Sequence, residues 1–537
     1  MQIKQTIRNL WEEKPLTLIL FLGIFFRLIA VIFSKGFAFH DDEFLVLDPA
    51  GSWVAGYDFN HWLGGIPGAN SAPEGPSLFF PGLNYLVLYY LTWRGMVDPQ
   101  HKMYVIRALM ALWSLIIIVV GYRIANFYGG KKVARQTGLL LSIFWFMPML
   151  SVRSLVEMFC IPPLLLATWM AINPAKKDKL STYFWIGILC GIAFNTRFQT
   201  ALFSGGFGLI ILFPILAGTR HLDRGRNINW KRFFGFSFMF VVTVFAVQGV
   251  VDLFIWHRPF AEFKEYIIYN INNDRNYPVG PWYNFFLVLA GILVPPVSLF
   301  LMLGFFKSWK KYTILFLPSF LFFAFHSIFP NKQERFILPI VPFVIILGCI
   351  GWNEFVTASK YWQKHPGLLK GCWTFFWILN CLALPIVSTM YSKRSRVESM
   401  YYLYHQKDLK NFMVEESFRD NVTQTPFFYA NRWDFHPVEI SDKVSLYHAY
   451  QWHIYDTNPL FHPNYVLFYG TDNIDKRVAA FKRMFPTTTY KTTIKPSYLD
   501  LLMFKLNPVN RNETVYIYEF NDTVVNLPKD SILRRQK

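Results

Sequence analysis

The chain has 537 residues, of which 53% are hydrophobic and 19% aromatic, and its mean hydropathy is +0.26. This composition excludes an ordinary soluble protein, because apolar segments of about 20 residues separated by short polar links match the thickness of a bilayer core. The net charge of +19 does not indicate a nucleic-acid partner, since the basic residues cluster between the apolar segments, where they orient a membrane protein.

Eleven apolar segments are predicted to span the membrane. The first has no small-residue cleavage site, so we expect a retained helix and not a signal peptide. A further apolar run at 77–93 is predicted to be an interfacial helix, because counting it as a span would invert the charge pattern of every later loop. The eleven predicted spans are residues 15–34, 104–126, 137–152, 155–172, 183–198, 200–217, 233–255, 282–304, 312–328, 336–350 and 373–391.

Basic residues set the predicted orientation. The segments between spans that we predict to be inside carry 20 Lys and Arg in 76 residues, whereas the loop 35–103 carries three in 69. The positive-inside rule therefore places this loop on the extracytoplasmic side. The predicted location is a bacterial inner membrane with the site facing the periplasm, or alternatively the endoplasmic reticulum membrane with a lumenal site. The cysteine-free tail is compatible with a periplasm.

The sequence pattern changes from about residue 392, where the long apolar runs stop. Short stretches predicted as strands follow, namely "TPFFYA", "NYVLFYG", "TTTYKTTIKP", "YLDLLMFKLN" and "TVYIYEF". Between two of them, "DNIDKRVAAFKRMF" has helical spacing and an Asp at a plausible N-cap. The predicted architecture is an α-helical polytopic membrane protein over 1–391, with interfacial helices in the loop 35–103, and an extracytoplasmic α/β domain over 392–537.

Three consecutive carboxylates, Asp41, Asp42 and Glu43, follow the first predicted span. Acidic residues are favoured in the first turn of a helix, so a solvated helix start would explain them. A carboxylate at this place could also accept a proton from a sugar hydroxyl, and adjacent like charges tend to raise the pKa of one member. The spacing leaves both interpretations open.

The segment "FPNKQERFILP" at 329–339 carries Lys332 and Arg335 between two late spans. Side chains of this kind anchor helices by snorkelling at the membrane surface. They also suit a lipid-linked phosphate, because Arg offers a planar fork and Lys a point charge. Fixed cations would stabilise the charge that a leaving phosphate gains in the transition state.

Two further segments place charges among apolar residues. In "SVRSLVEMF", Arg153 and Glu157 are four apart and are predicted to face each other on one helix turn, as a structural ion pair or as a site. In "AFNTRFQTALF", Arg197 lies between two apolar halves, where an ionisable group is costly and often functional. The alternative is that Arg197 caps a tight turn.

The loop at 256–286 combines His257, Asp274 and Arg275 with amides and aromatic rings. Aromatic faces and polar side chains hold sugars by stacking and by hydrogen bonds to hydroxyls. The same residues fit an interfacial aromatic belt equally well.

In this order, the motifs resemble the GT-C glycosyltransferases, and within them glycosyltransferase family 22, which includes mannosyltransferases of N-glycan and GPI-anchor assembly. The first-loop signature of that family resembles "HDDEF", which supplies His40, Asp42, Glu43 and Phe44, with Asp41 in place of a proline. The later signature resembles "NKQERF", which keeps Lys332, Arg335 and Phe336 and departs at Asn331 and Gln333. The resemblance covers about residues 15–350.

The resemblance implies an enzyme that moves mannose, with inversion, from a polyprenyl-phosphate donor to a glycan or glycolipid acceptor on the extracytoplasmic face. It implies no metal and no cofactor. We therefore predict that Asp42 is the base, helped by Asp41 or Glu43, and that Lys332 and Arg335 bind the donor phosphate. The residues predicted to bind substrate are His40, Arg153, Glu157, Arg197, His257, Asp274 and Arg275.

A secondary transporter or lipid flippase is the alternative from another class. Such a protein would carry ionisable residues at mid-membrane and show symmetry between its halves. Here the charges gather at one predicted surface, and no internal repeat is visible.

Overall fold

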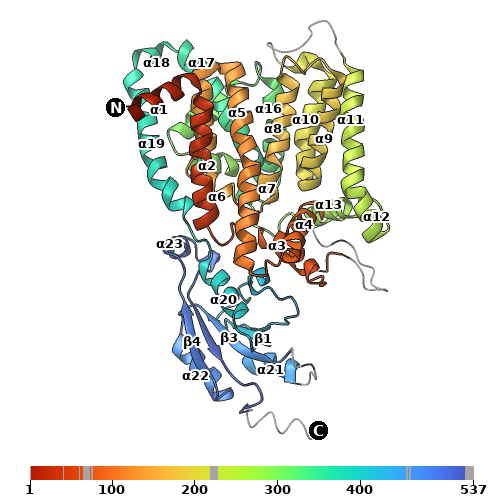
Figure 1. Cartoon of the computed structure of the whole chain (residues 1–537), viewed down its shortest axis with the longest axis vertical. Coiled ribbons are helices and arrows are strands. Elements are labelled where there is room, and N and C mark those ends of the chain that lie inside the picture. Colours follow the sequence, from red (N-terminus) through yellow and green to blue (C-terminus); the bar gives the residue numbers. More distant parts are fainter. Residues whose placement is uncertain are drawn as a thin grey trace. The chain divides into compact units, whose positions relative to one another are not determined.

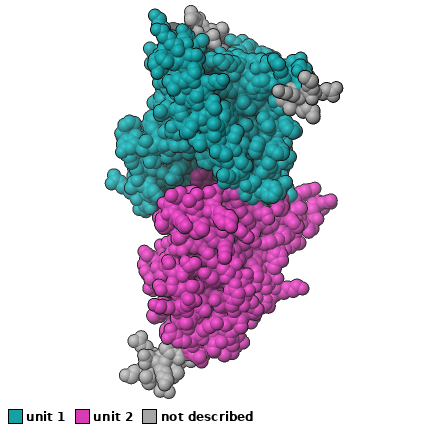
Figure 2. Space-filling view, turned by 90° about the vertical axis from the view of Figure 1, so that its left-hand side faces the viewer, with its two compact units in different colours: residues 1–33, 61–84, 105–389 teal, residues 34–60, 85–104, 390–537 magenta. Residues whose placement is uncertain are grey.

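The computed structural model describes residues 2–39, 42–59, 61–63, 73, 77–217, 228–454, 458 and 461–526. The chain divides into two compact units, shown in different colours in Figure 2. Unit 1 comprises residues 1–33, 61–84 and 105–389, and unit 2 comprises residues 34–60, 85–104 and 390–537. Nothing in this division tests the predicted boundary at residue 391, which stays a prediction.

Unit 1 is made of helices (Figure 1). Two of its helices, α4 (Phe79–Trp93) and α5 (Pro99–Ile143), continue into unit 2. The other helices and helical turns are α1 (Gln2–Glu13), α2 (Pro15–Phe33), α6 (Met147–Leu150), α7 (Val156–Phe159), α8 (Ile161–Ile172), α9 (Leu180–Thr196), η1 (Phe198–Thr200), α10 (Ala201–Leu212), η2 (Pro214–Ala217), α11 (Trp230–Val244), η3 (Phe245–Gly249), α12 (Val250–Trp256), α13 (Ala261–Asn272), α14 (Asn284–Ile292), α15 (Val297–Lys307), α16 (Thr313–Ile328), η4 (Glu334–Ile340), α17 (Val341–Ala358), α18 (Lys360–Lys364) and α19 (Pro366–Ser388).

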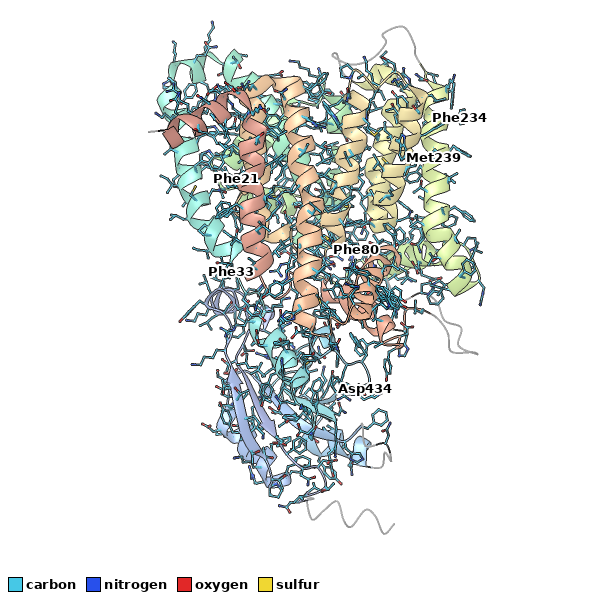
Figure 3. The ribbon with its side chains drawn as sticks, viewed as in Figure 1. Phe21, Phe33, Phe80, Phe234, Met239 and Asp434 are labelled. Atoms are coloured by element: carbon cyan, nitrogen blue, oxygen red, sulfur yellow. The ribbon has the colours of Figure 1, made fainter. Side chains whose placement is uncertain are left out.

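Apolar side chains cover the outside of these helices. Phe21 and Phe33 on α2 and Phe234 on α11 point away from the helices packed behind them (Figure 3), and they are 65%, 54% and 61% exposed. Within the described residues, five helical segments are long and apolar enough to cross a membrane: Pro15–Phe33, Pro99–Ile143, Trp230–Trp256, Glu334–Ala358 and Pro366–Ser388. Shorter apolar helices lie at most of the other predicted spans, so the count of eleven stays a prediction.

The predicted break between the second and third membrane spans takes a different form in the structure. The spans predicted at 104–126 and 137–152 were expected to be joined by a basic loop at 127–136. Instead α5 runs through this region, and its direction changes at Gly130, where φ is 73° and ψ is −177°. Only glycine adopts such a backbone readily, so a single residue makes the break that the loop was expected to make.

Unit 2 contains a five-stranded mixed sheet with strand order β2-β1-β3-β5-β4. The first three neighbours in this order pair in parallel, and β5 pairs antiparallel with both β3 and β4. The elements of unit 2 are α3 (Phe44–Val54), α20 (Arg394–Tyr404), β1 (Asn411–Glu415), η5 (Phe427–Ala430), β2 (Val438–Ile440), α21 (Leu446–Ile454), β3 (Pro463–Tyr469), α22 (Ile474–Met484), β4 (Thr489–Ile494), α23 (Tyr498–Leu506), η7 (Pro508–Asn510) and β5 (Val515–Glu519).

The segment after the first span packs within unit 2, far along the sequence from its neighbours. The carboxylate of Asp48 on α3 is buried and accepts a hydrogen bond from the backbone amide of Phe428 at 2.7 Å. Gly36 pairs with Ser392 as an isolated bridge, and a Cβ at Gly36 would collide with the Ser392 carbonyl. Sequence separation of more than 350 residues hid this packing, because no local pattern reports it.

Two strand predictions in unit 2 are wrong. The stretch "TPFFYA" forms the turn η5, and "YLDLLMFKLN" forms the helix α23. The Ser497 hydroxyl caps α23 by accepting from the amide of Asp500 at 3.1 Å, a cap that the apolar spacing alone did not indicate. The helix predicted in "DNIDKRVAAFKRMF" is confirmed as α22, but its N-cap is Asn473 in a left-handed conformation and not an Asp.

Candidate functional site

Three charged side chains from separate elements of unit 1 meet and form what we call the ionic cluster: Glu157, Arg197 and Arg335. Glu157 lies in the first turn of α7, Arg197 between α9 and η1, and Arg335 in η4. Arg197 donates to Glu157 Oε1, and Arg335 Nη1 lies 3.8 Å from the same oxygen. The side chains of Glu157 and Arg197 are 1% and 4% exposed, whereas that of Arg335 is 20% exposed.

The local backbone explains how Arg197 reaches this position. Its amide donates to Ala193 O at 2.9 Å and closes α9, while its own φ of −151° and ψ of 107° are extended. The chain therefore leaves the helix at Arg197 before η1 begins. The residue ends a helix at a tight turn, as one interpretation of the sequence predicted, and it also places a buried guanidinium in the ionic cluster. Its role in binding substrate stays a prediction.

One aromatic ring, that of Phe336, lies beside both guanidinium groups. The Phe336 ring centroid lies 5.3 Å from Arg197 Cζ and 5.5 Å from Arg335 Cζ. Tyr266 on α13 accepts a hydrogen bond from Gln199, and burial raises the pKa of its hydroxyl. Removing water in this way strengthens every charge interaction inside the cluster.

Among the described residues, the ionic cluster holds two guanidinium groups and one carboxylate. Gln333 also holds Arg335, since its Oε1 accepts from Nε at 2.9 Å and from Nη2 at 2.7 Å. Within the described chain, Glu157 Oε2 and both Nε and Nη2 of Arg197 are buried without a hydrogen-bond partner. Buried donors are nearly always paired, so the two orphan atoms of Arg197 call for acceptor oxygens of the kind that an anionic ligand carries.

Lys332 has a different arrangement from Arg335. Its ammonium donates to three backbone carbonyls at the C-terminal end of α16, His326 O at 2.9 Å, Ser327 O at 2.8 Å and Phe329 O. Burial lowers the pKa of this ammonium. All three N–H donors are used, so Lys332 would have to exchange carbonyls for phosphate oxygens to act as predicted. Its role at the donor phosphate stays a prediction.

Arg153 does not face Glu157 on a helix turn, as the four-residue spacing predicted. Residues 151–155 form turns and extended backbone before α7 begins at Val156, so the i to i+4 geometry is absent. Arg153 is fully buried in this turn, and Glu157 instead pairs with Arg197. The prediction failed because a sequence spacing has helical meaning only where the backbone is helical.

The other predicted substrate residues lie at the two ends of the segment around α13. His257 ends α12 in a left-handed conformation and is exposed. Asp274 and Arg275 follow α13 and are half-buried and exposed, respectively. No hydrogen bond or ion pair joins these three to the ionic cluster in the described part of the chain, and their role stays a prediction.

The predicted catalytic segment belongs to unit 2. His40 and Asp41 lie outside the described residues. Asp42 is half-buried in the turn before α3, and Glu43 is fully buried, with its Oε2 accepting from the amide of Ala38 at 3.0 Å. Glu43 therefore holds the loop that carries Asp42. The position of Asp42 ahead of the helix leaves its side chain partly accessible to solvent.

A second buried polar group was missed by sequence reasoning, and we call it the carboxylate cluster: Ser77, Gln248, Asp252 and Glu262. The Gln248 amide donates to Asp252 Oδ1 at 2.7 Å and to Glu262 Oε2, and its oxygen accepts from Ser77 Oγ at 2.6 Å. Glu262 Oε2 also accepts from the amide of Leu78 at 2.9 Å. The available signal was Asp252 inside the apolar run "GVVDLFIW", where a carboxylate is costly.

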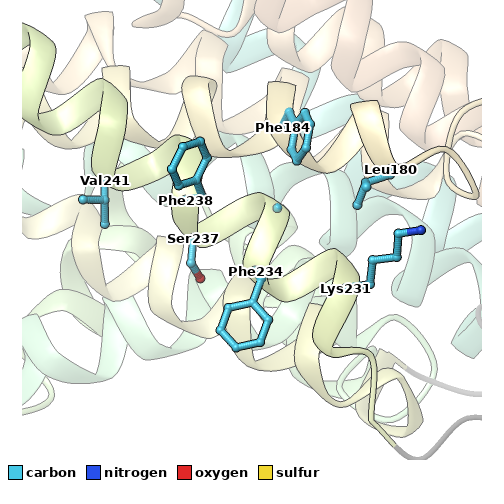
Figure 4. A pocket seen from close by; sticks show the side chains of 8 residues that line it. Leu180, Phe184, Lys231, Phe234, Ser237, Phe238 and Val241 are labelled. Carbon is cyan, nitrogen blue, oxygen red and sulfur yellow. The ribbon is translucent and has the colours of Figure 1, made fainter.

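An open hollow of about 630 Å³ lies between α9 and α11 (Figure 4). Its lining is almost wholly apolar, with Lys231 at one end. Leu180 and Phe184, at the start of α9, help to form it, whereas Arg197 follows the end of the same helix. The rise of an α-helix separates the two ends of α9 by roughly 25 Å, so the hollow is not part of the ionic cluster.

Comparison with known proteins supplies the family. The profile described as the Alg9-like mannosyltransferase family matches residues 18–423, which is three quarters of the sequence. The chain belongs to this family. Membership confirms the resemblance to glycosyltransferase family 22 that the motifs indicated, and, together with the apolar helices, it indicates an integral membrane protein.

Individual relatives are distant. The human alpha-1,2-mannosyltransferase ALG9 is 25% identical over 265 residues, which cover 46% of this chain and 40% of that protein. GPI mannosyltransferase 3 of Debaryomyces hansenii is 23% identical over 422 residues, covering 76% of this chain and 71% of that protein. The match to ALG9 thus spans less than half of either chain.

The fold is shared with a solved structure. The crystal structure of ArnT from Cupriavidus metallidurans bound to undecaprenyl phosphate superposes with a TM-score of 0.58 and covers 94% of this chain and 97% of that one. At 12% identity the likeness concerns the fold alone, and the GT-C assignment stays a prediction.

Among the described residues, no group of three or more His, Cys, Asp or Glu side chains is assembled as a metal site. Metal- and cofactor-independent chemistry stays a prediction.

Proposed function

We propose that the protein transfers mannose, with inversion, from a polyprenyl-phosphate donor to a glycan or glycolipid acceptor on the extracytoplasmic face of its membrane. The observation that carries the proposal is the buried guanidinium of Arg197 in the ionic cluster, whose Nε and Nη2 have no hydrogen-bond partner within the described residues. A lipid-linked phosphate supplies the acceptor oxygens that such a cluster lacks. Membership of the Alg9-like mannosyltransferase family supports mannose as the sugar, and the undecaprenyl phosphate bound by ArnT supports the lipid carrier.

The proposed reaction is a direct displacement. The acceptor hydroxyl oxygen attacks the anomeric carbon while its proton passes to the carboxylate of Asp42, which the half-buried turn before α3 leaves accessible. The bond from the anomeric carbon to the phosphate oxygen breaks, and its electron pair stays on the phosphate. Arg335 and Arg197 stabilise the charge that develops on that phosphate.

Two variants test the two halves of this mechanism in isolated membranes with labelled polyprenyl-phosphate mannose. Asp42→Asn keeps the size of the side chain and removes the base, so we expect transfer to be abolished while binding of the donor remains. Arg335→Ala should raise the KM for the donor, and Arg335→Lys should recover part of the loss because it restores the charge without the fork. The matched control is Asp420→Asn, an acid whose side chain is 72% exposed.

Full activity of Asp42→Asn would remove Asp42 from the role of base. Unchanged donor kinetics in Arg335→Ala would remove the phosphate contact. Uptake of sugar into sealed vesicles driven by an ion gradient, without transfer to acceptor, would instead support the transporter alternative.

Unit 2 has three potential N-glycosylation motifs, at Asn421, Asn512 and Asn521, and they provide a test of the proposed face of the membrane. Asn421 and Asn521 are exposed, whereas Asn512 is buried and donates to Asp500 Oδ1 at 3.3 Å. In a eukaryotic host we expect glycans on Asn421 and Asn521 but not on Asn512, read as two mobility shifts that endoglycosidase removes. A protein that carries no glycan, and whose unit 2 is cut by protease from the cytosolic side, would contradict the proposed face.

A further inference from the structure

Helix α23 of unit 2 presents an apolar stripe that the described residues of its unit leave exposed. Tyr498, Leu502 and Leu506 follow one another at four-residue spacing, so they lie on one face of the helix. They are 97%, 50% and 73% exposed. Soluble domains seldom present several large apolar side chains side by side to water, so this stripe indicates a contact surface.

A buried carboxylate, that of Asp500, ties the helix to the rest of its unit. Asp500 is 1% exposed, and its carboxylate accepts from the backbone amides of Lys393 at 2.8 Å and of Arg394 at 3.0 Å. Asn512 donates to the same carboxylate, and the Ser497 cap closes the first turn. The apolar stripe therefore belongs to a helix with a defined position and not to a loose segment.

The place of that anchor along the chain limits where α23 can lie. Lys393 comes five residues after Ser388, the last residue of α19, and α19 is a 23-residue helix apolar enough to cross a membrane. Five residues of extended chain reach at most about 18 Å. The anchor of α23 is thus held close to the end of a membrane span by chain length alone.

We propose that α23 lies in the interfacial layer of the lipid bilayer, with the stripe of Tyr498, Leu502 and Leu506 buried among the lipid chains. Lys505 is exposed on the same helix, where its ammonium can reach anionic headgroups, and a tyrosine suits the boundary between chains and headgroups. The contact is with lipid and does not depend on the proposed transfer reaction.

Depth-dependent quenching tests this contact in the full-length protein. Cys372 and Cys381 are first replaced by Ser, since they are the half-buried and the exposed thiol. Leu502→Cys then carries a fluorophore in nanodiscs of phosphatidylcholine and phosphatidylglycerol that contain brominated lipid. Ala480→Cys on α22 is the control, because this position is exposed and α22 lies at the other end of the unit from α23 (Figure 1).

We expect brominated lipid to quench the label at 502 at least twofold more than the label at 480, and iodide in water to show the opposite order. The double variant Leu502→Glu, Leu506→Glu, labelled through Met503→Cys, should lose most of the lipid quenching that Met503→Cys alone shows. Equal lipid quenching at 502 and 480 would overturn the proposal. A dimer in detergent that the double variant dissociates would also overturn the proposal, because a second copy of the chain would then cover the stripe.

Discussion

The ionic cluster and the carboxylate cluster are both buried in unit 1, yet their hydrogen bonding differs. In the carboxylate cluster Gln248 bonds both acids, and Ser77 and Leu78 add two further donors. In the ionic cluster two guanidinium groups share one carboxylate oxygen, and two buried donors, Nε and Nη2 of Arg197, have no partner in the described chain. The carboxylate cluster has one unpaired acceptor there, Glu262 Oε1, so only the ionic cluster holds donors that the described fold leaves unsatisfied.

This difference separates a structural role from a binding role. A buried network that its own amides satisfy rigidifies the segments it joins, here the start of α4 and the corner between α12 and α13. A buried guanidinium with unpaired donors, as in Arg197 within the described chain, carries an unfavourable desolvation cost until a ligand supplies acceptors. Substitutions in the ionic cluster should therefore change transfer more than folding, and substitutions in the carboxylate cluster should do the reverse.

The largest expected effect is that of Arg197→Ala. It removes one of the two cations and leaves Glu157 buried without its partner. We expect transfer to fall roughly 10²- to 10³-fold, the usual loss when one charge-stabilising donor is removed. Arg197→Lys should recover part of the activity. A loss of folded protein that equals the loss of transfer would contradict the comparison, and detergent-extracted yield measured beside activity checks it.

Lys332 and Arg335 should respond differently to truncation. Arg335→Ala is expected to raise the KM for the donor by roughly tenfold or more, the factor that corresponds to one charge-assisted hydrogen bond of 1.5–3 kcal/mol. Lys332→Met removes a side chain that bonds three carbonyls of the chain itself, so it should lower the thermal midpoint and change the donor KM less. Equal effects of the two variants on the donor KM would restore Lys332 as a phosphate ligand.

The sequence predicted the charged residues of the ionic cluster better than it predicted their contacts. Arg197 stood out because a guanidinium between apolar halves is costly, and Arg335 because it follows a recognisable pattern. That Glu157 pairs with Arg197 and not with Arg153 depends on a non-helical turn at 151–155 that no spacing reports. Gln248 and Glu262 escaped notice for the same reason, since 14 residues and a change of helix separate them.

Helix α23 was missed for a different physical reason. Its run of leucines and aromatic residues suits a half-buried strand as well as a helix, and short apolar segments do not distinguish the two by periodicity. The sequence nevertheless predicted β3, β4, β5 and α22, where β-branched and aromatic residues or helical spacing agree with the local turns.

Glu262→Ala should have a moderate effect, on stability rather than on transfer. It leaves the Leu78 amide and one of the two N–H groups of the Gln248 amide without their acceptor, which costs about 1–3 kcal/mol. Glu262→Gln keeps an acceptor oxygen of the same size and should cost less. Thermal unfolding in detergent, followed by tryptophan fluorescence, compares the two with the unchanged protein. A larger loss in the Gln variant than in the Ala variant would contradict the hydrogen-bonding role.

A pH dependence of stability is expected from the carboxylate cluster. Burial, followed by the nearby charge of Asp252, raises the pKa of Glu262 from 4.5 to about 8. Its neutral form is favoured in the folded state, so the contribution of Glu262 to stability is complete below pH 4.5 and is lost as the pH rises toward 8. The charge of Arg258 acts on Asp252. Arg258 also pairs with Glu265 at 3.4 Å, which limits how far it can offset the negative charge of the carboxylate cluster. The thermal midpoint of the unchanged protein should therefore fall between pH 5 and pH 8 by more than that of Glu262→Gln, which cannot ionise. Parallel changes of the thermal midpoint for the two proteins over this range would show that Glu262 is already ionised in the folded protein. The carboxylate cluster would then not be the neutral, hydrogen-bonded network that its comparison with the ionic cluster requires.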